Sequence, residues 1–174
     1  MHIRTATPQD AKPLRQLRLQ ALQTNPEAFG SSYEEELAQP LELTERRLQD
    51  AAKSPDTFTL VIEGELDGQT QLVGMAGFVR TQRQKRQHIG IIWGVYLSPA
   101  VRGQGWGRRL MAAIIDRAKQ LDGLEQILIS VVTENVAARQ LYQSLGFEVY
   151  GLEPRALKLA GRYLDEEFML LRLS

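Results

Sequence analysis

The chain has 174 residues, 43% hydrophobic and 24% charged, which is the ordinary composition of a globular protein with one sizeable core. Its 21 lysines and arginines balance its 21 aspartates and glutamates, so no global charge draws it to nucleic acid or to an anionic membrane. Cysteine is absent, which excludes disulfides, thiolate metal sites and cysteine nucleophiles.

No segment has the pattern of a targeting or membrane-spanning sequence. The first eight residues lack the long apolar core of a signal peptide. No apolar run approaches the roughly 18 to 20 residues that a membrane helix needs. We therefore expect a cytoplasmic enzyme or binding protein without a membrane partner.

The first third of the chain predicts a short strand followed by two helices. Residues 2–5 form the strand, and Thr7 is a suitable helix N-cap, with Pro8 at the first helical position and Asp10 three residues after the cap. Apolar residues then follow at helical spacing: Leu14, Leu17, Ala21 and Leu22. This helix should end near residues 24–26.

A loop over residues 29–33 and a more polar helix over residues 44–53 should precede the sheet. Alternation then predicts a strand through Phe58, Leu60 and Ile62. Asp67-Gly68 is typical of a turn, and residues 72–79 form the returning strand.

A central strand is predicted over residues 89–97, after a polar connection over residues 81–87. The run is apolar, aromatic and free of charge, as in a strand buried in the middle of a sheet. Gly90 and Gly94 lie within it and indicate a bulge or a close backbone approach.

A glycine-rich loop over residues 102–107 follows this strand and opens into a helix that Asp122-Gly123 ends. One face of the helix is apolar: Leu110, Met111, Ile114, Ile115, Ala118 and Leu121. A buried strand is predicted over residues 127–132, and a further helix over residues 135–145 is stopped by Gly146.

The last two strands are expected over residues 147–151 and 167–173. Residues 157–163 lie between them and contain a Gly161-Arg162 turn signal. The order of elements predicts one α+β domain over residues 1–174. Its sheet should be mostly antiparallel, with a strand–helix–strand crossover in the middle.

The glycine loop carries the first chemical signal. Helix starts leave backbone N–H groups unpaired, and the helix dipole favours an anion there. Glycines let the backbone approach a phosphate, and Arg102 and Arg108 add charged donors. This is suitable chemistry for a pyrophosphate.

Glycine spacing alone leaves other interpretations open. No Gly-Lys-Ser/Thr follows, so the loop is not that of a nucleotide triphosphatase. The third glycine comes too early for the dinucleotide fingerprint. A glycine-rich helix start with surface arginines, and no ligand, also fits the spacing.

Two motifs together resemble the GNAT family of N-acetyltransferases. The first is Arg102-x-x-Gly105-x-Gly107, preceded by Val95-Tyr96-Leu97-Ser98-Pro99. The second is Asn135-x-x-Ala138-x-x-Leu141-Tyr142-x-x-x-Gly146-Phe147. The resemblance in element order covers essentially the whole chain. It implies a central splayed sheet flanked by helices, and acetyl-CoA as co-substrate.

The resemblance also implies a set of contacts to the co-substrate. Backbone groups of Val95, Tyr96 and Leu97 should pair with the pantetheine arm as an added strand would, and the Val95 amide should polarise the thioester carbonyl. Backbone amides of the loop should hold the pyrophosphate: Gly103, Gln104, Gly105, Trp106, Gly107 and Arg108. Asn135 and Ala138 should contact it from the next helix.

Tyr142 is the predicted catalytic residue, with its hydroxyl near the thioester sulfur. Attack by an amine expels a thiolate, which benefits from a proton, and a tyrosine near pKa 10 can donate one at neutral pH. The plainer interpretation is a core tyrosine on the apolar face of its helix, beside Ala138, Leu141 and Leu145. The second motif favours the catalytic role.

The base that deprotonates the amine is not evident. Many relatives carry a glutamate on the central strand or on the strand after the glycine-loop helix, but residues 89–97 hold no acid and residues 127–132 offer only Ser130. His88 has a suitable intrinsic pKa, although a partly exposed strand-end histidine is the plainer interpretation. The working hypothesis is deprotonation through water.

The acceptor site should lie opposite the co-substrate. Four aromatic residues are predicted to bind the acceptor: Phe29, Tyr33, Trp93 and Tyr163. Acidic residues that would suit a cationic amine are Glu34, Glu35, Asp165 and Glu166. A solvated helix start explains the glutamates equally, and Trp93 fits a sheet core as well.

The main hypothesis is an N-acetyltransferase that uses acetyl-CoA and a small-molecule or protein amine in a ternary complex. No metal is expected, since His2 and His88 lie far apart. The basic cluster between residues 80 and 86 lacks interleaved aromatics and does not predict nucleic-acid binding. Two alternatives are a non-catalytic acyl-CoA sensor on the same fold and an interaction module without co-substrate. A homodimer is expected only by analogy with the family.

Overall fold

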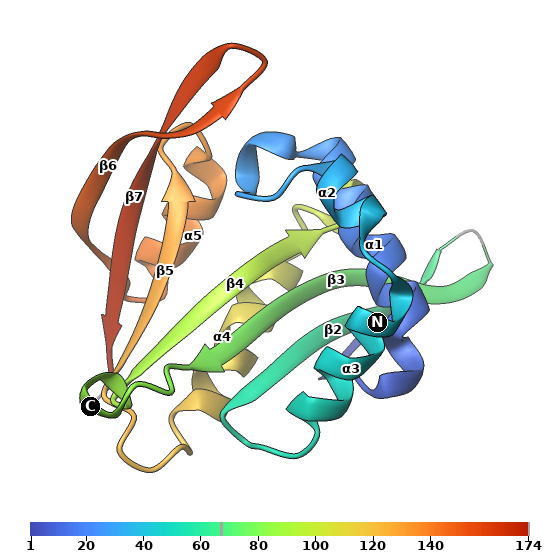
Figure 1. Cartoon of the computed structure of the whole chain (residues 1–174), viewed down its shortest axis with the longest axis horizontal. Coiled ribbons are helices and arrows are strands. Elements are labelled where there is room, and N and C mark those ends of the chain that lie inside the picture. Colours follow the sequence, from blue (N-terminus) through green and yellow to red (C-terminus); the bar gives the residue numbers. More distant parts are fainter. Residues whose placement is uncertain (67, 174) are drawn as a thin grey trace.

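The computed structural model describes residues 1–66 and 68–173, and its strands form a seven-stranded sheet (Figure 1). The strands are β1 (His2–Thr5), β2 (Thr57–Leu66), β3 (Gln69–Arg80), β4 (Ile89–Leu97), β5 (Gln126–Val132), β6 (Glu148–Leu159) and β7 (Arg162–Arg172). Their order is β1-β2-β3-β4-β5-β7-β6, and among these pairs β4–β5 is the parallel one. The mostly antiparallel α+β sheet predicted from the sequence is confirmed.

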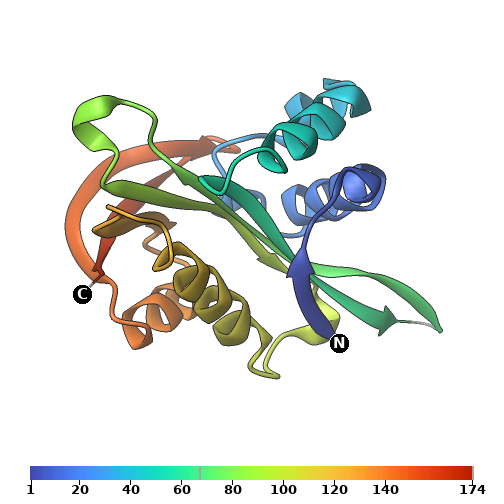
Figure 2. The ribbon, with the colours of Figure 1, turned by 90° about the horizontal axis from the view of Figure 1, so that it is seen from below.

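Helices cover both faces of the sheet, as Figure 2 shows. The helices on one face are α1 (Ala11–Thr24), α2 (Tyr33–Ala38) and α3 (Leu41–Ala51), and those on the other are α4 (Trp106–Ala118) and α5 (Val136–Ser144). Each face has its own apolar layer: Leu14, Leu17 and Leu48 pack on Met75 under α1 and α3. The predicted apolar face of α4 packs on the opposite side, where Leu110, Met111 and Ile114 are fully buried.

The connection between α1 and β2 contains one more helix than predicted. The expected loop at residues 29–33 ends at Ser32, because Ser32 caps α2: Glu35 N donates to Ser32 Oγ at 3.1 Å, and Ser32 N donates to Glu35 Oε2 at 2.8 Å. The polar helix begins at Leu41 rather than at residue 44. The turn predicted at Asp67-Gly68 involves Asp67, which lies outside the described residues.

The C-terminal strands are longer than predicted and form one hairpin. Residues 157–163 are not a separate segment, because Leu157 pairs with Leu164 and Leu159 pairs with Arg162. The turn is Ala160-Gly161, both with positive φ (48° and 82°), as tight hairpins require. Much of β6 is exposed, so its sequence lacks the alternation by which a strand is normally predicted.

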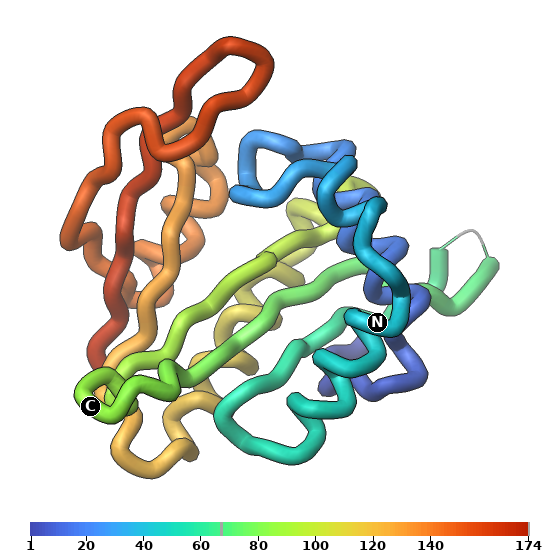
Figure 3. The backbone as a smooth tube through the Cα atoms, in the orientation of Figure 1, coloured from blue at the N-terminus to red at the C-terminus, as the bar shows by residue number. Residues whose placement is uncertain are grey.

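β4 and β5 diverge, and Figure 3 shows the backbones separating from a common end. They pair only from Ile89 to Ile91 on β4. Beyond that point β4 bulges: Gly94 and Val95 together stand opposite Ala76, and Gly94 has a φ of 64°. Gly90 makes the predicted close approach, since a Cβ there would lie 2.4 Å from the Phe78 ring. Both glycine predictions are therefore confirmed, at different positions of one strand.

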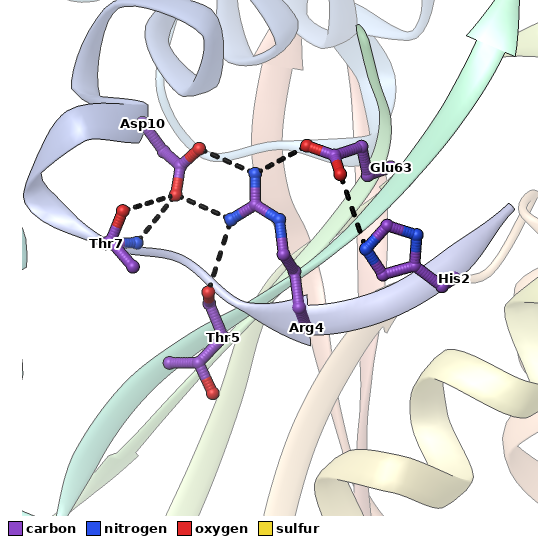
Figure 4. A network of polar contacts seen from close by, with 6 residues as sticks. All are labelled: His2, Arg4, Thr5, Thr7, Asp10 and Glu63. Atoms are coloured by element: carbon purple, nitrogen blue, oxygen red, sulfur yellow. Dashed lines mark hydrogen bonds and ion pairs between the residues drawn. The ribbon is translucent and has the colours of Figure 1, made fainter. Parts of the chain in front are cut away.

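A polar network fixes the N-terminal corner (Figure 4). Arg4 on β1 donates to both carboxylate oxygens of Asp10, at 2.7 and 2.8 Å, and to Glu63 of β2 at 2.8 Å. Asp10 also accepts from the backbone and the hydroxyl of Thr7, at 2.7 and 2.9 Å. Arg4 holds the pKa of Asp10 at about 2, below its usual value. The network ties β1 to the start of α1.

Candidate active site

A cleft of about 800 Å³ opens where β4 and β5 diverge. One wall is β4 from Ile91 to Leu97, and the facing wall is β5 from Leu128 to Val132. The glycine loop, α5 and the segment after α1 also border it. The predicted site residues that line it are Phe29, Trp93, Val95, Tyr96, Leu97, Arg102, Gly103, Gly107, Asn135, Ala138 and Tyr142.

The glycine loop has the geometry of an anion-binding helix start. Gly103 and Gly105 both have left-handed backbones, with φ of 74° and 78°, and Gly105 is the N-cap of α4. A Cβ at either position would meet nothing within 4 Å, so conformation rather than crowding requires glycine there. The first amides of α4 have no helical partner and point out of its positive end. The loop therefore fits a pyrophosphate.

The two arginines of the loop already bind protein groups. Arg102 donates to the Leu97 carbonyl at 3.0 Å and to Asn25 Oδ1 at 2.6 Å, which links the end of β4 to the segment after α1. Arg108 donates to Ser144 Oγ at 2.7 Å. The backbone amides, rather than these side chains, are thus the groups most available to a phosphate. Gln104, Gly105, Trp106 and Arg108 belong to the loop without bordering the cleft itself.

The exposed edge of β4 can accept an extended ligand. Past Ile91 this edge has no β5 partner, so the backbone of residues 95–97 faces the cleft. The side chains of this segment are anchored elsewhere: Tyr96 is buried under α1, and its hydroxyl lies 2.9 Å from Thr24 Oγ1. An anchored strand with a free edge suits the amide-bearing arm of a pantetheine chain.

Tyr142 projects from α5 into the cleft. Asn135 caps that helix, because its side chain accepts a hydrogen bond from Ala138 N at 3.2 Å. Asn135 and Ala138, the two residues predicted to contact the co-substrate from this helix, therefore also have a structural role. Tyr142 is only 5% exposed, and burial raises the pKa of its hydroxyl. Within the described residues the hydroxyl hydrogen-bonds to no protein group, which leaves its proton available to a ligand at neutral pH.

A carboxylate reaches the cleft from a strand that the sequence analysis did not consider for the base. Glu166 on β7 lines the cleft and accepts a hydrogen bond from Ser130 Oγ on β5 at 3.2 Å. The register brings them together, because Glu166 lies opposite Val132, two residues along from Ser130. His88 sits at the closed end of β4, outside the cleft lining.

The predicted acceptor residues separate into two groups. Phe29 and Trp93 line the cleft, and Trp93 is 47% exposed. Tyr33 and Tyr163 do not line it. Tyr163 lies on the C-terminal hairpin under the guanidinium of Arg155, 3.7 Å from its ring centroid. The remaining acidic candidates also lie outside the lining: Glu34, Glu35 and Asp165.

Sequence reasoning missed several cleft residues, among them Arg18, Tyr150 and Phe168. Arg18 had a signal, because it follows Leu14 by four residues and precedes Leu22 by four, on the apolar face of α1. A charged residue at such a position needs an explanation. Tyr150 and Phe168 pack together at 6.1 Å on strands whose boundaries were predicted too short.

Two further findings concern metals and membranes. Among residues 1–66 and 68–173, no group of three or more histidine, aspartate and glutamate side chains is arranged to hold a metal ion. Within the same residues, no helix has the length and apolar character needed to cross a bilayer.

A sheet that splays between β4 and β5, with a glycine loop at the start of the following helix, is the arrangement expected of an N-acetyltransferase that uses acetyl-CoA. The chain belongs to the acetyltransferase (GNAT) family, whose model matches residues 19–147.

Solved structures and characterised relatives agree with this assignment. A GNAT-family acetyltransferase of Streptococcus pneumoniae has a TM-score of 0.86 and 26% identity over 99% of both chains. A Salmonella typhimurium protein solved with its cofactor acetyl-CoA has a TM-score of 0.82 and 25% identity, over 100% of this chain and 94% of that one.

Two relatives are L-methionine sulfoximine/L-methionine sulfone acetyltransferases. The Pseudomonas paraeruginosa enzyme is 28% identical over 78% of this chain and 77% of its own length. The Salmonella typhimurium enzyme is 38% identical, but the match spans about half of each chain, 46% in both cases.

Proposed function

We propose that the protein transfers the acetyl group of acetyl-CoA directly to the primary amine of a small acceptor, in a ternary complex. The observation that carries this proposal is the cleft between β4 and β5, because one opening joins an anion-binding helix start, a free strand edge and a buried tyrosine hydroxyl. We expect no covalent acyl-enzyme, since the chain has no cysteine and no Ser-His pair stands out in its sequence.

The co-substrate would bind along the free edge of β4. The amides from Gly103 to Arg108 would hold its pyrophosphate, and the backbone of residues 95–97 would pair with the pantetheine arm. Asn135 and Ala138 would contact it from the start of α5. The bulge supports a role for Val95, because it interrupts the ladder with β3 where the amide is needed to polarise the thioester carbonyl.

The transfer step makes one carbon–nitrogen bond and breaks one carbon–sulfur bond. The amine nitrogen attacks the thioester carbonyl carbon, and the sulfur leaves with the electron pair of the carbon–sulfur bond. The Tyr142 hydroxyl donates the proton that makes the free thiol. The ammonium gives one proton to a base before the attack, and the second proton, lost from nitrogen after the attack, returns through water to the Tyr142 phenolate. Burial keeps Tyr142 protonated for this role.

Glu166 is the base that the structure favours over the water relay considered from the sequence. It lines the cleft, and its hydrogen bond from Ser130 fixes one carboxylate oxygen. An ammonium group entering between Trp93 and β7 would meet this carboxylate first. Loss of its proton to Glu166, directly or through one water, then produces the attacking amine.

The acceptor that we favour is a small amine rather than a protein N-terminus. Two relatives carry the names of acetyltransferases for amino-acid derivatives. In this chain Phe29 and Trp93 border the acceptor end of the cleft and limit its width. A cytoplasmic location, the lack of nucleic-acid, membrane and metal partners, and a homodimer stay predictions.

The test is a thiol-release assay with acetyl-CoA and a panel of small amines, amino acids and peptides. Turnover with at least one small amine, with N-acetyl product identified by mass, is the expected result. Acetyl-CoA should also raise the melting temperature, because ligand at 100 times its Kd adds about 2.7 kcal/mol to stability. Binding without turnover on any amine would instead support the acyl-CoA sensor, and absence of binding would support the interaction module.

A further inference from the structure

Arg18 is a largely enclosed charged side chain that makes no hydrogen bond to the described residues. Its side chain is 17% exposed, and it lies on the apolar face of α1. Its Nη1 is buried and has no hydrogen-bond partner among the described residues. The nearest carboxylate is that of Glu36, whose Oε2 is 3.8 Å from Arg18 Nε, beyond hydrogen-bonding distance.

Such an arrangement is unfavourable unless something else supplies acceptors. A buried ion normally has several hydrogen bonds, and an unpaired buried donor costs free energy. Arginine cannot avoid this cost by losing its proton. Burial lowers the pKa of Arg18, Glu36 opposes that effect, and the nearby positive charge of Arg47 on α3 adds to it. The site therefore favours an added negative charge.

The position of Arg18 indicates which ligand would supply that charge. Arg18 lines the cleft, and its Nη1 would be 3.9 Å from a Cβ built on Gly94. Gly94 and Val95 form the bulge whose Val95 amide would polarise the thioester carbonyl. An anion at Arg18 would thus lie next to the reacting amine. Phe29 packs against the other side of the guanidinium, 4.6 Å from its ring centroid, and holds it in place.

We propose that Arg18 binds the α-carboxylate of an amino-acid acceptor, whose α-amine then faces the thioester. This inference rests on the proposed acetyl transfer and names the substrate class that the same cleft selects. An α-carboxylate and its amine are separated by one carbon, which matches an anion site beside the reacting position. The guanidinium fork would donate two hydrogen bonds to the carboxylate.

A second chamber gives the acceptor side chain a place to go. It has a volume of about 610 Å³, lies between α1, α3 and β3, and shares Arg18, Ser31, Trp93 and Gly94 with the cleft. Leu14, Leu48 and Met75 supply apolar walls. Arg18 therefore stands at the junction of the two spaces, where a group common to all α-amino acids would be bound.

The experiment compares acids with neutral analogues. The probes are the twenty L-amino acids, their α-methyl esters, and 3-methylbutylamine as an amine that lacks the carboxylate, each tested with acetyl-CoA by thiol release. We expect at least one acid to exceed its own ester by tenfold or more in kcat/KM. Arg18→Met should then raise KM for that acid about 10- to 100-fold and change KM for 3-methylbutylamine less than twofold. Arg18→Lys should restore part of the loss.

Arg46→Met is the matched control, since Arg46 is an exposed arginine of α3 that borders neither space. It should change neither KM. Two results would overturn the role of Arg18 and leave acetyl transfer standing. One is a kcat/KM for the esters or the simple amine that equals that of every acid. The other is an Arg18→Met variant whose KM rises equally for charged and neutral acceptors. Absence of thiol release with every probe would instead contradict the proposed acetyl transfer. A melting temperature that acetyl-CoA does not change would support that conclusion independently of Arg18.

Discussion

Two arginines, Arg4 and Arg18, compare a side chain that serves structure with one that we propose binds a ligand. Arg4 makes three hydrogen bonds to carboxylates, two of them to Asp10, in a closed network (Figure 4). Arg18 is more enclosed, at 17% against 28% exposure, yet makes no hydrogen bond to the described residues.

The two regions differ in whether their charged groups have partners within the protein. In the N-terminal corner every charge has a protein partner, so removing one group leaves another unpaired. In the cleft, Arg18 and the Tyr142 hydroxyl make no hydrogen bond to the described residues. Glu166 accepts one hydrogen bond and has acceptor capacity left for a ligand. Substitutions in the corner should therefore affect stability, and substitutions in the cleft should affect chemistry.

The largest effect is expected from Tyr142→Phe. This variant removes the proton donor and keeps the ring that packs beside Phe147 at 6.1 Å. We expect kcat to fall about 1,000-fold, within the range that general acids contribute, with acetyl-CoA affinity unchanged. Single-turnover kinetics and a ligand-induced shift in melting temperature measure the two quantities. Unchanged turnover would remove Tyr142 from the mechanism and leave it a core residue.

Glu166→Gln should have the next largest effect on activity. The amide keeps an acceptor for the Ser130 hydroxyl but cannot take a proton, so kcat/KM should fall about 100-fold. Glu153→Gln is the matched control, because Glu153 is the exposed register partner of Glu166 on β6 and lies outside the cleft. Equal losses in both variants would indicate a general charge effect, and no loss in Glu166→Gln would return the mechanism to the water relay.

The comparison of the two arginines is tested most directly by stability. Arg4→Met removes three hydrogen bonds and leaves the Asp10 carboxylate without an ion-pair partner, so the free energy of unfolding should fall by about 3 kcal/mol. Arg18→Met removes no hydrogen bond and keeps an apolar stem, and the ion pair with Glu36 that it breaks is a long one of 3.8 Å, so the loss should be smaller, about 1 kcal/mol. Urea unfolding of both variants measures this. A loss at Arg18 as large as that at Arg4 would mean that Arg18 is structural.

Local patterns predicted the elements where one face is buried and missed them where tertiary pairing decides. The apolar spacing of α4 and the unbroken apolar run of β4 each follow from burial, and both were predicted within a few residues. The β6–β7 hairpin was predicted too short because its strands extend past the core and are held by pairing to each other.

The candidate site divides in the same way. The loop at Arg102–Gly107 and the motif at Asn135–Tyr142 are each a continuous stretch of sequence, so each could be recognised by itself. The structure brings both to one cleft. Glu166 was predicted only as an acidic residue near the acceptor. Its role as the base could not be assigned from sequence, because its proximity to Ser130 depends on the β5–β7 register. Arg18 could have been: a cation on the apolar face of α1 contradicts the burial pattern around it.

The last prediction concerns the loss of stability in acid that the N-terminal corner should cause. The pKa of Asp10 is about 2 in the folded protein, against 3.8 for an aspartate in an unfolded chain, so folding stabilises the ionised form. That contribution is complete above about pH 5 and is lost as the pH falls through about 2. A shift of nearly two pH units corresponds to about 2.5 kcal/mol, and the carboxyl is only 10% exposed, so screening by water is limited.

The stability difference between wild type and Asp10→Asn should therefore be constant above about pH 5 and shrink toward about pH 2, as measured by urea unfolding across that range. Tyr142→Phe, in the cleft, should show no such convergence, because the tyrosine stays protonated throughout. A gap for Asp10→Asn that persists undiminished at pH 2 would mean that the charge of this carboxylate does not hold the corner together.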